Sequence, residues 1–344
     1  MKHDIKSKLP SEILEYFASI GEQKYRAGQL FRWLRGGAES FAEMTNLSES
    51  LRAKLDERFI ITKPELIEKQ VSAADGTIKY LWRMADGHAI ESVLMEYSHG
   101  NTVCISTQAG CRMGCVFCAS AIGGLKRDLT ASEMENQVFY SQFDSGKKIS
   151  NIVLMGIGEP LDNFDNVIRF LTIIRHPDGM NIGARHITLS TCGLTDKIKK
   201  LAEQDIQLTL SISLHAPDDD TRAQLMPIAR SVSVDDLLKT CAEYYHAAKR
   251  RVSYEYAMID GVNDTPAQAK LLAGKLKNTG SHVNLILLND VPEYGFRPSS
   301  PQSLDAFSKT LSQYGINYTI RRRLGADIDA SCGQLRQKHM NSKS

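Results

Sequence analysis

The sequence of 344 residues lacks the features that would place a protein in a membrane or in an oxidising compartment. No apolar run approaches the roughly 20 residues that a membrane span requires. The segment that begins Met1-Lys2-His3-Asp4 carries no secretory signal, and seven cysteines are an odd number for a disulfide framework. We therefore expect a soluble, cytoplasmic protein with no membrane partner.

The sequence also lacks a strong excess of charge of one sign. Lys and Arg together number 42 and Asp and Glu 40, for a formal net charge of +2, so global charge does not predict a nucleic-acid-binding protein. One stretch, residues 24–35, carries four basic and no acidic residues between aromatic side chains. It could bind an RNA backbone, or it could be the solvated face of a helix over an aromatic core.

Three of the cysteines lie close together in a stretch that contains glycine, residues 110–118. Cys111, Cys115 and Cys118 have the spacing CxxxCxxC, and soft thiolates that converge from one short loop are typical of an iron–sulfur cluster site. Three cysteines would leave one iron of a four-iron cluster open to a substrate or cofactor. The alternatives are unligated buried thiols or a zinc site completed by Cys104, and the spacing argues against zinc.

Hydrophobic periodicity divides the chain into three parts. Residues 11 to about 60 have the period of helices, and residues 65–97 alternate with period two around two Asp-Gly turns, which predicts a small antiparallel meander. Beyond Gly100, strands predicted at 102–107, 151–155, 186–190, 207–213, 252–259 and 283–288 alternate with helices predicted at 131–143, 164–175, 194–204, 234–248 and 265–277, and a last strand is predicted at 316–320. This alternation predicts an α/β fold whose parallel sheet forms a partial barrel of about six β/α units, with the chemistry at the carboxyl ends of its strands.

Small and polar residues stand where the predicted strands end. Gly156-Ile157-Gly158-Glu159-Pro160 follows the second strand, where glycine permits close backbone approach and Glu159 could accept hydrogen bonds from an ammonium group. The other strand ends carry Ser190, Ser213-Leu214-His215 and Asn289. Singly, each could be ordinary turn chemistry, as a lone histidine usually is. On successive strands, they together indicate a ligand site.

The cysteine spacing, with Phe117 before the third cysteine, resembles that of the radical S-adenosylmethionine (SAM) superfamily. The whole chain, from its helical start to the segment DIDASCGQL at 327–335, resembles the RlmN/Cfr family of radical SAM RNA methyltransferases. This resemblance implies a helical accessory domain at 1–64, the meander at 65–97, a radical SAM partial barrel with a C-terminal catalytic-cysteine loop at 98–335, and a polar tail at 336–344. It also implies one [4Fe-4S] cluster on the three cysteines and SAM contacts at Gly158, Glu159, Ser190, Ser213, Leu214, His215 and Asn289.

The same resemblance implies a reaction. In that family a cysteine that matches Cys332 is methylated by one SAM molecule, and its methyl group then loses hydrogen to the 5′-deoxyadenosyl radical from a second SAM. The resulting carbon radical adds to an adenine ring carbon. A carboxylate that matches Glu91 takes the ring proton, and a cysteine that matches Cys104 releases the product through a transient disulfide with Cys332.

The resemblance further implies the substrates and partners. RlmN-type members modify C2 of adenosine 2503 in 23S ribosomal RNA and of adenosine 37 in some transfer RNAs, and Gly158-Glu159-Pro160-Leu161 is the RlmN-type pattern. We expect a monomer that takes electrons from a reductant such as flavodoxin or ferredoxin, with Arg321, Arg322 and Arg323 as candidates for RNA phosphate contacts. Two alternatives stay open: the same chemistry at C8, as in Cfr-type members, and a non-catalytic, metal-stapled RNA-binding module.

Overall fold

The computed structural model describes residues 2–288 and 295–328 of the chain. Two of the predicted site residues, Asn289 and Cys332, lie outside the described residues, and so does the tail at 336–344. None of the helices in the described part is long and apolar enough to cross a membrane.

One sheet of ten strands organises the described part of the chain, in the order β14-β13-β12-β11-β10-β9-β6-β5-β4-β3. Its parallel strands are β6 (Gly100–Ile105), β9 (Ile149–Leu154), β10 (Ile187–Thr191), β11 (Thr209–Ser213), β12 (Val252–Met258), β13 (His282–Leu287) and β14 (Asn317–Ile320). All seven residues of β12 are buried, as expected for a strand covered on both faces. The predicted α/β fold with a parallel partial barrel is confirmed.

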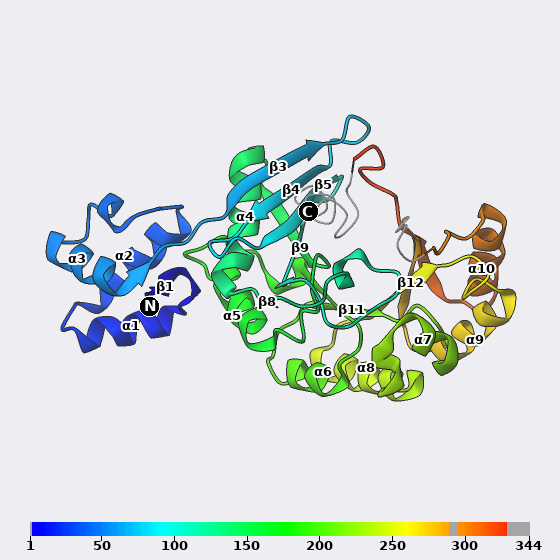
Figure 1. The fold of residues 1–344 in the computed structure, drawn as a ribbon. Coiled ribbons are helices and arrows are strands. Elements are labelled where there is room, and N and C mark those ends of the chain that lie inside the picture. The colour runs from blue at the N-terminus through cyan, green and yellow to red at the C-terminus, as the bar shows by residue number, and fades with distance from the viewer. Residues whose placement is uncertain (1, 289–294, 329–344) are drawn as a thin grey trace.

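Helices cover the outer face of this curved sheet (Figure 1). They are α4 (Ala131–Ser145), α5 (Phe164–Ile174), α6 (Thr195–Ala202), α7 (Asp219–Leu225), α8 (Val234–Ala248), α9 (Pro266–Leu276) and α10 (Pro301–Gln313). Local sequence explains where two of them begin: Thr130 caps α4 and Thr265 caps α9, each with a capping box. Two helices, α7 and α10, were not predicted because each is short or rich in polar residues.

The predicted meander consists of β3 (Glu65–Val71), β4 (Ile78–Arg83) and β5 (Ala89–Tyr97), paired antiparallel. It does not form a sheet of its own. Strand β5 turns back at Tyr97 and pairs antiparallel with β6, so the meander extends the barrel sheet and covers an edge that would otherwise expose unpaired backbone groups.

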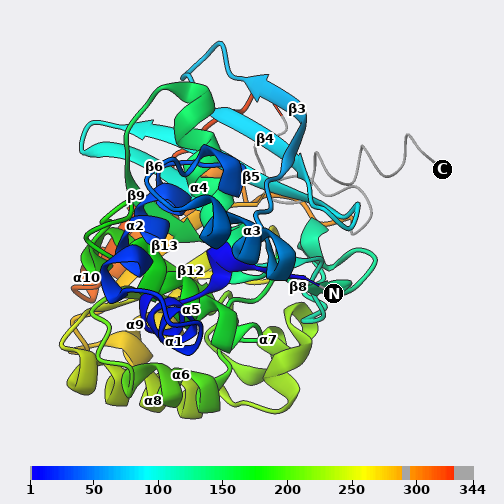
Figure 2. The same cartoon turned by 90° about the vertical axis from the view of Figure 1, so that its left-hand side faces the viewer.

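The N-terminal helices α1 (Pro10–Ser19), α2 (Lys24–Arg35) and α3 (Glu49–Arg58) have an apolar cluster of their own. Figures 1 and 2 show them at the end of the molecule opposite α10. Arg35, one of the four basic residues considered for RNA contact, is only 6% exposed and forms an ion pair with Glu135 of α4. Arg35 therefore binds the barrel and not RNA. The domain boundaries stay a prediction.

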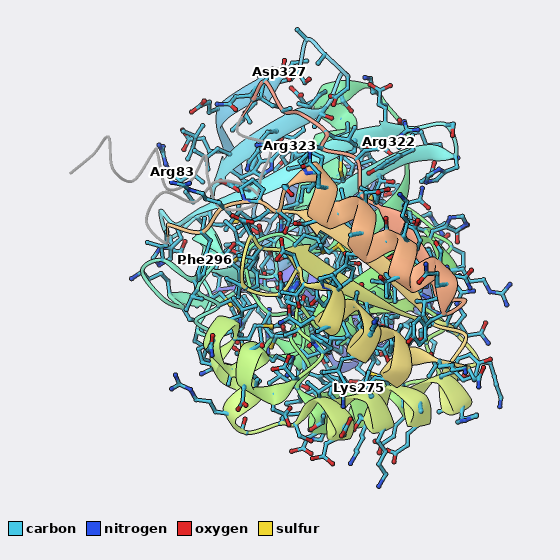
Figure 3. All side chains as sticks on the ribbon, turned by 90° about the vertical axis from the view of Figure 1, so that its right-hand side faces the viewer. Arg83, Lys275, Phe296, Arg322, Arg323 and Asp327 are labelled. Atoms are coloured by element: carbon cyan, nitrogen blue, oxygen red, sulfur yellow. The ribbon has the colours of Figure 1, made fainter. Side chains whose placement is uncertain are left out.

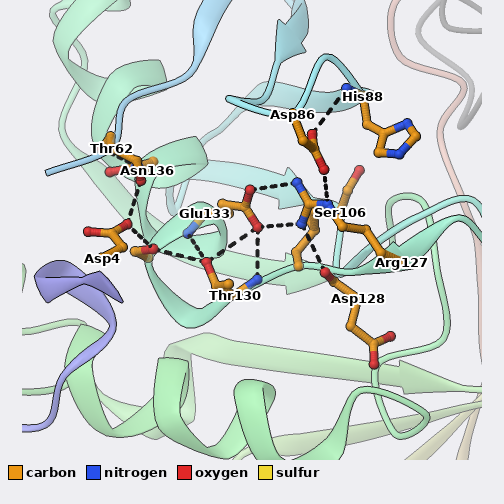
Figure 4. Close-up of polar contacts among 12 residues, drawn as sticks. Asp4, Thr62, Asp86, His88, Ser106, Arg127, Asp128, Thr130, Glu133 and Asn136 are labelled. Carbon is orange, nitrogen blue, oxygen red and sulfur yellow. Dashed lines mark hydrogen bonds and ion pairs between the residues drawn. The ribbon is translucent and has the colours of Figure 1, made fainter. Parts of the chain in front are cut away.

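A second set of polar contacts joins the meander to the barrel. Arg127 forms an ion pair with Asp86 in the β4–β5 turn and donates two hydrogen bonds to Glu133 in the first turn of α4, at 2.8 and 2.7 Å (Figure 4). Nearby, the Asn136 side-chain amide donates to the carbonyl of Thr62 at 3.0 Å. Helix α4 is thus bonded to both of the segments that precede the barrel.

Replacing Arg35 by Met should lower the free energy of unfolding by about 3–5 kcal/mol, because the change leaves the buried Glu135 carboxylate without its partner. Urea-induced unfolding followed by circular dichroism would measure the loss. The double variant Arg35→Met/Glu135→Leu should recover most of it, since both charges are removed. A single variant as stable as the wild-type protein would show that water solvates Glu135.

Candidate active site

The carboxyl ends of the parallel strands enclose a cavity with a volume of about 280 Å³. The predicted cluster ligands Cys111, Cys115 and Cys118 all line it. Their loop packs on an apolar cluster that includes Leu225, and the amide of Val116 donates to the carbonyl of Leu225 at 3.0 Å. The fold therefore brings the three thiols to one wall of one cavity.

The shape of the cysteine loop depends on Gly110, which precedes the first thiol. Gly110 has a φ of +88°, and a Cβ atom built there would lie 2.0 Å from the carbonyl oxygen of Gly124. Only glycine fits where two backbone segments approach so closely. Strand β7 (Gln108–Ala109) pairs with β8 (Arg127–Asp128), and this short ribbon closes the loop at its base.

The segment after β9 places Glu159 in the cavity wall. Gly158 has a φ of +108°, and a Cβ atom there would lie 2.6 Å from Cβ of Gln108. The Glu159 carboxylate accepts hydrogen bonds from the amides of Cys192 at 2.8 Å and Leu161 at 3.0 Å. Burial raises the pKa of the Glu159 carboxyl, and these amides act in the opposite direction. The site thus holds a fully enclosed carboxyl group that a cationic ligand would stabilise in its charged form.

Ser190, Ser213 and His215 line the same cavity. The hydroxyl oxygens of Ser190 and Ser213 lie 3.5 Å apart on neighbouring strands. His215 accepts a hydrogen bond at Nδ1 from the amide of Ala257 at 2.9 Å, and its ring packs edge-on against Phe117. Burial, with a smaller contribution from the nearby positive charge of Arg222, lowers the pKa of His215 to about 3. The ring is therefore neutral, with its proton on Nε2, which makes it a hydrogen-bond donor.

Leu214 behaves differently from its two neighbours. Its side chain is fully buried in the main apolar core, and its carbonyl accepts a hydrogen bond from Nε of Arg222 at 3.2 Å. Any contact of Leu214 with a ligand would have to come from its backbone.

Cys104 and Glu91 lie beyond the lining of the cavity, on β6 and β5. Cys104 is opposite Val93 in the antiparallel ladder, and Glu91 is two residues before Val93, so both side chains leave the same face of the sheet. Cys104 is buried in an apolar cluster that includes Met155, which also lines the cavity. Glu91 is 3% exposed and its carboxylate lies 2.8 Å from Nζ of the buried Lys79.

The segment that leads toward Cys332 crosses from β14 to the β3–β4 turn (Figure 3). There the Asp327 carboxylate accepts hydrogen bonds from the Ser72 hydroxyl at 2.6 Å and the Ala73 amide at 2.9 Å. The amide of Gly325 donates to the Asp75 carboxylate at 2.8 Å. These three contacts, which we call the C-terminal anchor, lie five to seven residues before Cys332.

Sequence reasoning missed three residues of this site. Cys192 and Glu255 line the cavity, and the buried Arg222 donates to the carbonyls of Cys192 at 2.7 Å and Leu214 at 3.2 Å, which ties the ends of two strands together. A signal existed for Glu255, because it is the one charged residue in the otherwise apolar and small stretch 252–259. Arg222 lies on α7, which was itself not predicted.

The donor atoms of the cavity fit an iron–sulfur cluster with SAM. Three soft thiols line one wall, and two buried polar atoms in the lining, Ser120 Oγ and Glu255 Oε2, have no hydrogen-bond partner. In the described residues, no three His, Cys, Asp or Glu side chains meet closely enough to bind a single metal ion. The ligands of a four-iron cluster bind different irons and need not meet at one point.

A partial parallel barrel with three thiols at the carboxyl ends of its strands defines a radical SAM protein. The family model for the radical SAM superfamily matches residues 105–270, and the model described as the ribosomal RNA large subunit methyltransferase N-terminal domain matches residues 7–61. The crystal structure of a radical SAM methyltransferase from Sphaerobacter thermophilus superimposes with a TM-score of 0.90 at 41% identity, covering 96% of this chain and 98% of that one.

Relatives in sequence specify the family. The chain is 50% identical to a probable dual-specificity RNA methyltransferase RlmN from Alkaliphilus oremlandii, over 99% of each chain. It is 48% identical to the protein of the same name from Lachnoclostridium phytofermentans, over 98% of this chain and 95% of the relative. The chain belongs to the RlmN family.

The low pKa of His215 predicts a dependence of stability on pH. Between pH 6.5 and about 3 the unfolded chain binds a proton at His215 that the folded chain does not, so this residue should make the free energy of unfolding fall as the pH falls through that range. Above pH 6.5 it should contribute no slope. Unfolding of the wild-type protein and His215→Gln at pH 5 and pH 7 would measure the difference.

The ring itself offers an independent check of that prediction. Nitrogen chemical shifts of labelled histidine should show a neutral His215 ring down to pH 5 in the folded protein. A His215 ring that becomes protonated near pH 6.5 would contradict the buried, neutral state.

Proposed function

We propose that this member of the RlmN family methylates C2 of an adenosine in RNA by radical SAM chemistry. The observation that carries the proposal is the convergence of Cys111, Cys115, Cys118 and Glu159 on one cavity at the carboxyl ends of the strands, in a chain that shares half its residues with proteins named as RNA methyltransferases. By analogy with RlmN-type chains, the substrates are adenosine 2503 of 23S ribosomal RNA and adenosine 37 of some transfer RNAs.

The cavity residues divide into two sets by their chemistry. The three thiols would hold a [4Fe-4S] cluster, whereas Glu159, Ser190, Ser213 and His215 would hold SAM. When bound, the cluster and SAM supply a 5′-deoxyadenosyl radical that removes hydrogen from an S-methyl group. Glu159 would accept from the ammonium group of SAM, and the neutral His215 would donate from Nε2. Asn289, as predicted from sequence, would complete the contacts.

The chain itself would supply the methyl carrier and the groups that release the product. Cys332 would carry the methyl group as S-methylcysteine, and one further SAM would be used for each turnover to form it. Cys104 would then form the disulfide with Cys332 that frees the methylated RNA. Its apolar surroundings would limit the access of solvent oxidants to that thiol.

Glu91 would accept the adenine ring proton. It leaves the same sheet face as Cys104, and the contact with Lys79 holds its carboxylate in one position. A general base must reach the proton it removes, and this face is the one that continues into the cavity through Met155.

We further infer the RNA contacts, the location and the electron donor from the similarity to RlmN-type chains. Arg322 and Arg323 are exposed beyond β14 and lie on the side of the meander (Figure 3), where they would contact RNA phosphates in a salt-dependent way. The protein would act as a cytoplasmic monomer that takes electrons from a flavodoxin or a ferredoxin.

Nucleoside analysis tests the proposed product. RNA treated with the anaerobically reconstituted protein, SAM and a reductant should contain 2-methyladenosine. Formation of 8-methyladenosine would replace the C2 assignment by C8. Protein that binds no iron and forms no 5′-deoxyadenosine would support a non-catalytic RNA-binding module instead.

Three of the four cysteines outside the cluster set should separate by role. Cys104→Ala should accumulate a covalent protein–RNA adduct, because the disulfide that would release it cannot form, and denaturing gels would show this slower species. Cys332→Ala should form neither adduct nor methylated RNA. Cys241→Ala, which removes a buried thiol on α8, is the control and should match the wild-type protein. Equal product from all three variants would contradict the proposed methyl carrier.

The C-terminal anchor should matter for methyl transfer more than for SAM cleavage. Asp327→Ala removes the acceptor of two hydrogen bonds, so it should lower the amount of methylated RNA formed per 5′-deoxyadenosine severalfold. Asp305→Ala is the matched control, since it breaks an exposed pair on α10. An unchanged ratio in Asp327→Ala would show that the anchor has no part in the transfer.

A further inference from the structure

Glu255 is a buried carboxylate in the wall of the cavity that no step of the proposed function uses. It lies in the middle of β12 and is 4% exposed. Its Oε1 accepts hydrogen bonds from the Ser211 hydroxyl at 2.7 Å and from the Asn284 amide at 2.8 Å. Its Oε2 is buried and has no partner, although the residue lines the cavity.

A buried carboxylate with one oxygen bonded and the other without a partner is typical of a ligand-binding residue. A buried polar atom without a partner is unfavourable, and the penalty is larger for a charged group. The two contacts, from Ser211 on β11 and Asn284 on β13, hold the carboxylate in one orientation. A ligand with a hydrogen-bond donor at this point would satisfy the unpartnered oxygen.

We propose that Glu255 binds the ribose of SAM, with Oε2 accepting hydrogen bonds from the vicinal hydroxyls of the adenosyl group. The inference rests on the proposed function, because it assigns one further contact to the same cofactor. It adds a binding residue on β12 to those expected from sequence after the other strands.

Glu255 is three strands away from Glu159, the residue that would bind the ammonium group of SAM. Glu159 follows β9, and β10 and β11 lie between β9 and β12. Neighbouring strands are roughly 4.8 Å apart, so three strand spacings amount to roughly 14 Å along the sheet. If Glu159 binds the ammonium group, the part of the cofactor that extends past the two intervening strands would face Glu255.

The residues that line the cavity around Glu255 suit the ribose of SAM better than its adenine. Ser190 and Ser213 lead from Glu159 toward Glu255 on the two intervening strands, and Ser213 is directly opposite Glu255 in the parallel ladder. Beyond Glu255, the lining from β13 and from the residue that follows it is apolar: Ile286, Leu287 and Leu288. A flat adenine suits that apolar part, and hydroxyls suit the polar part.

Equilibrium binding of SAM tests the assignment without turnover. Titration calorimetry under anaerobic conditions, on reconstituted holoenzyme with an oxidised cluster and no reductant, should show that Glu255→Gln weakens SAM binding roughly 10- to 100-fold, the range for a hydrogen bond to a charged group. The wild-type protein should also bind 2′-deoxy and 3′-deoxy analogues of SAM more weakly than SAM. Glu255→Gln should lose most of that discrimination, because the acceptor of those hydroxyls has lost its charge.

Two further variants keep the test decisive. If Glu255→Gln does not yield folded protein, Asn284→Ala takes its place in the test. This variant keeps the Glu255 carboxylate but removes one of its hydrogen-bond donors, so it should weaken SAM binding by a smaller factor. Glu243→Gln changes an exposed carboxylate on α8 and should bind SAM as the wild-type protein does. Iron content and cluster absorbance should be equal in all variants before binding is compared.

Three outcomes would each decide the matter. If Glu255→Gln binds SAM and both deoxy analogues as the wild-type protein does, the inference is wrong. If it instead loses discrimination against an analogue that lacks the adenine amino group, the carboxylate faces the base and the ribose assignment is wrong. If the wild-type holoenzyme itself binds no SAM, it is the proposed function that fails.

Discussion

The alternation of side chains across one continuous sheet is the constraint on which the rest of the structure depends. Along β12, the residues Tyr254, Tyr256 and Met258 belong to the apolar core under the helices, whereas Glu255 and Ala257 line the cavity. Because the parallel strands are in register, each inward position of one strand stands beside an inward position of the next. Polar residues on separate strands therefore meet on one face, and a shift by one residue would bury Glu255 under the helices.

The same alternation of side chains continues beyond the barrel, because the meander belongs to the barrel sheet. Since β5 pairs with β6, Glu91 and Cys104 leave the face that carries the cavity, although Glu91 belongs to a segment that precedes the barrel in the chain. Ion pairs then fix the surrounding parts: Arg127 joins the meander turn to α4, and Arg35 joins α2 to the same helix. Helix α4 is the common support of both attached segments.

Sequence reasoning succeeded where the signal was local. Strand and helix positions in the barrel, the two Asp-Gly turns and the three clustered cysteines depend on short-range periodicity or spacing, and the structure has them close to where they were predicted. It failed where the decisive partner is distant in the chain. Arg35 looked like part of a basic helix face, but Glu135, one hundred residues away, makes it an interior ion pair. Arg222 and Glu255 also have partners that are distant in the chain: Cys192 for Arg222, and Ser211 and Asn284 for Glu255.

The sequence by itself determined the class of the protein: an α/β barrel, three thiols at one loop, and a resemblance strong enough to indicate the family. These features follow from the order of residues, because spacing and periodicity can be read from the sequence alone. Only the tertiary structure decided which residues share the cavity, that Leu214 points into the core, that the meander belongs to the barrel sheet, and that one oxygen of Glu255 is left without a partner. Those facts depend on strand order and register, which bring distant residues together and which no short stretch of sequence contains.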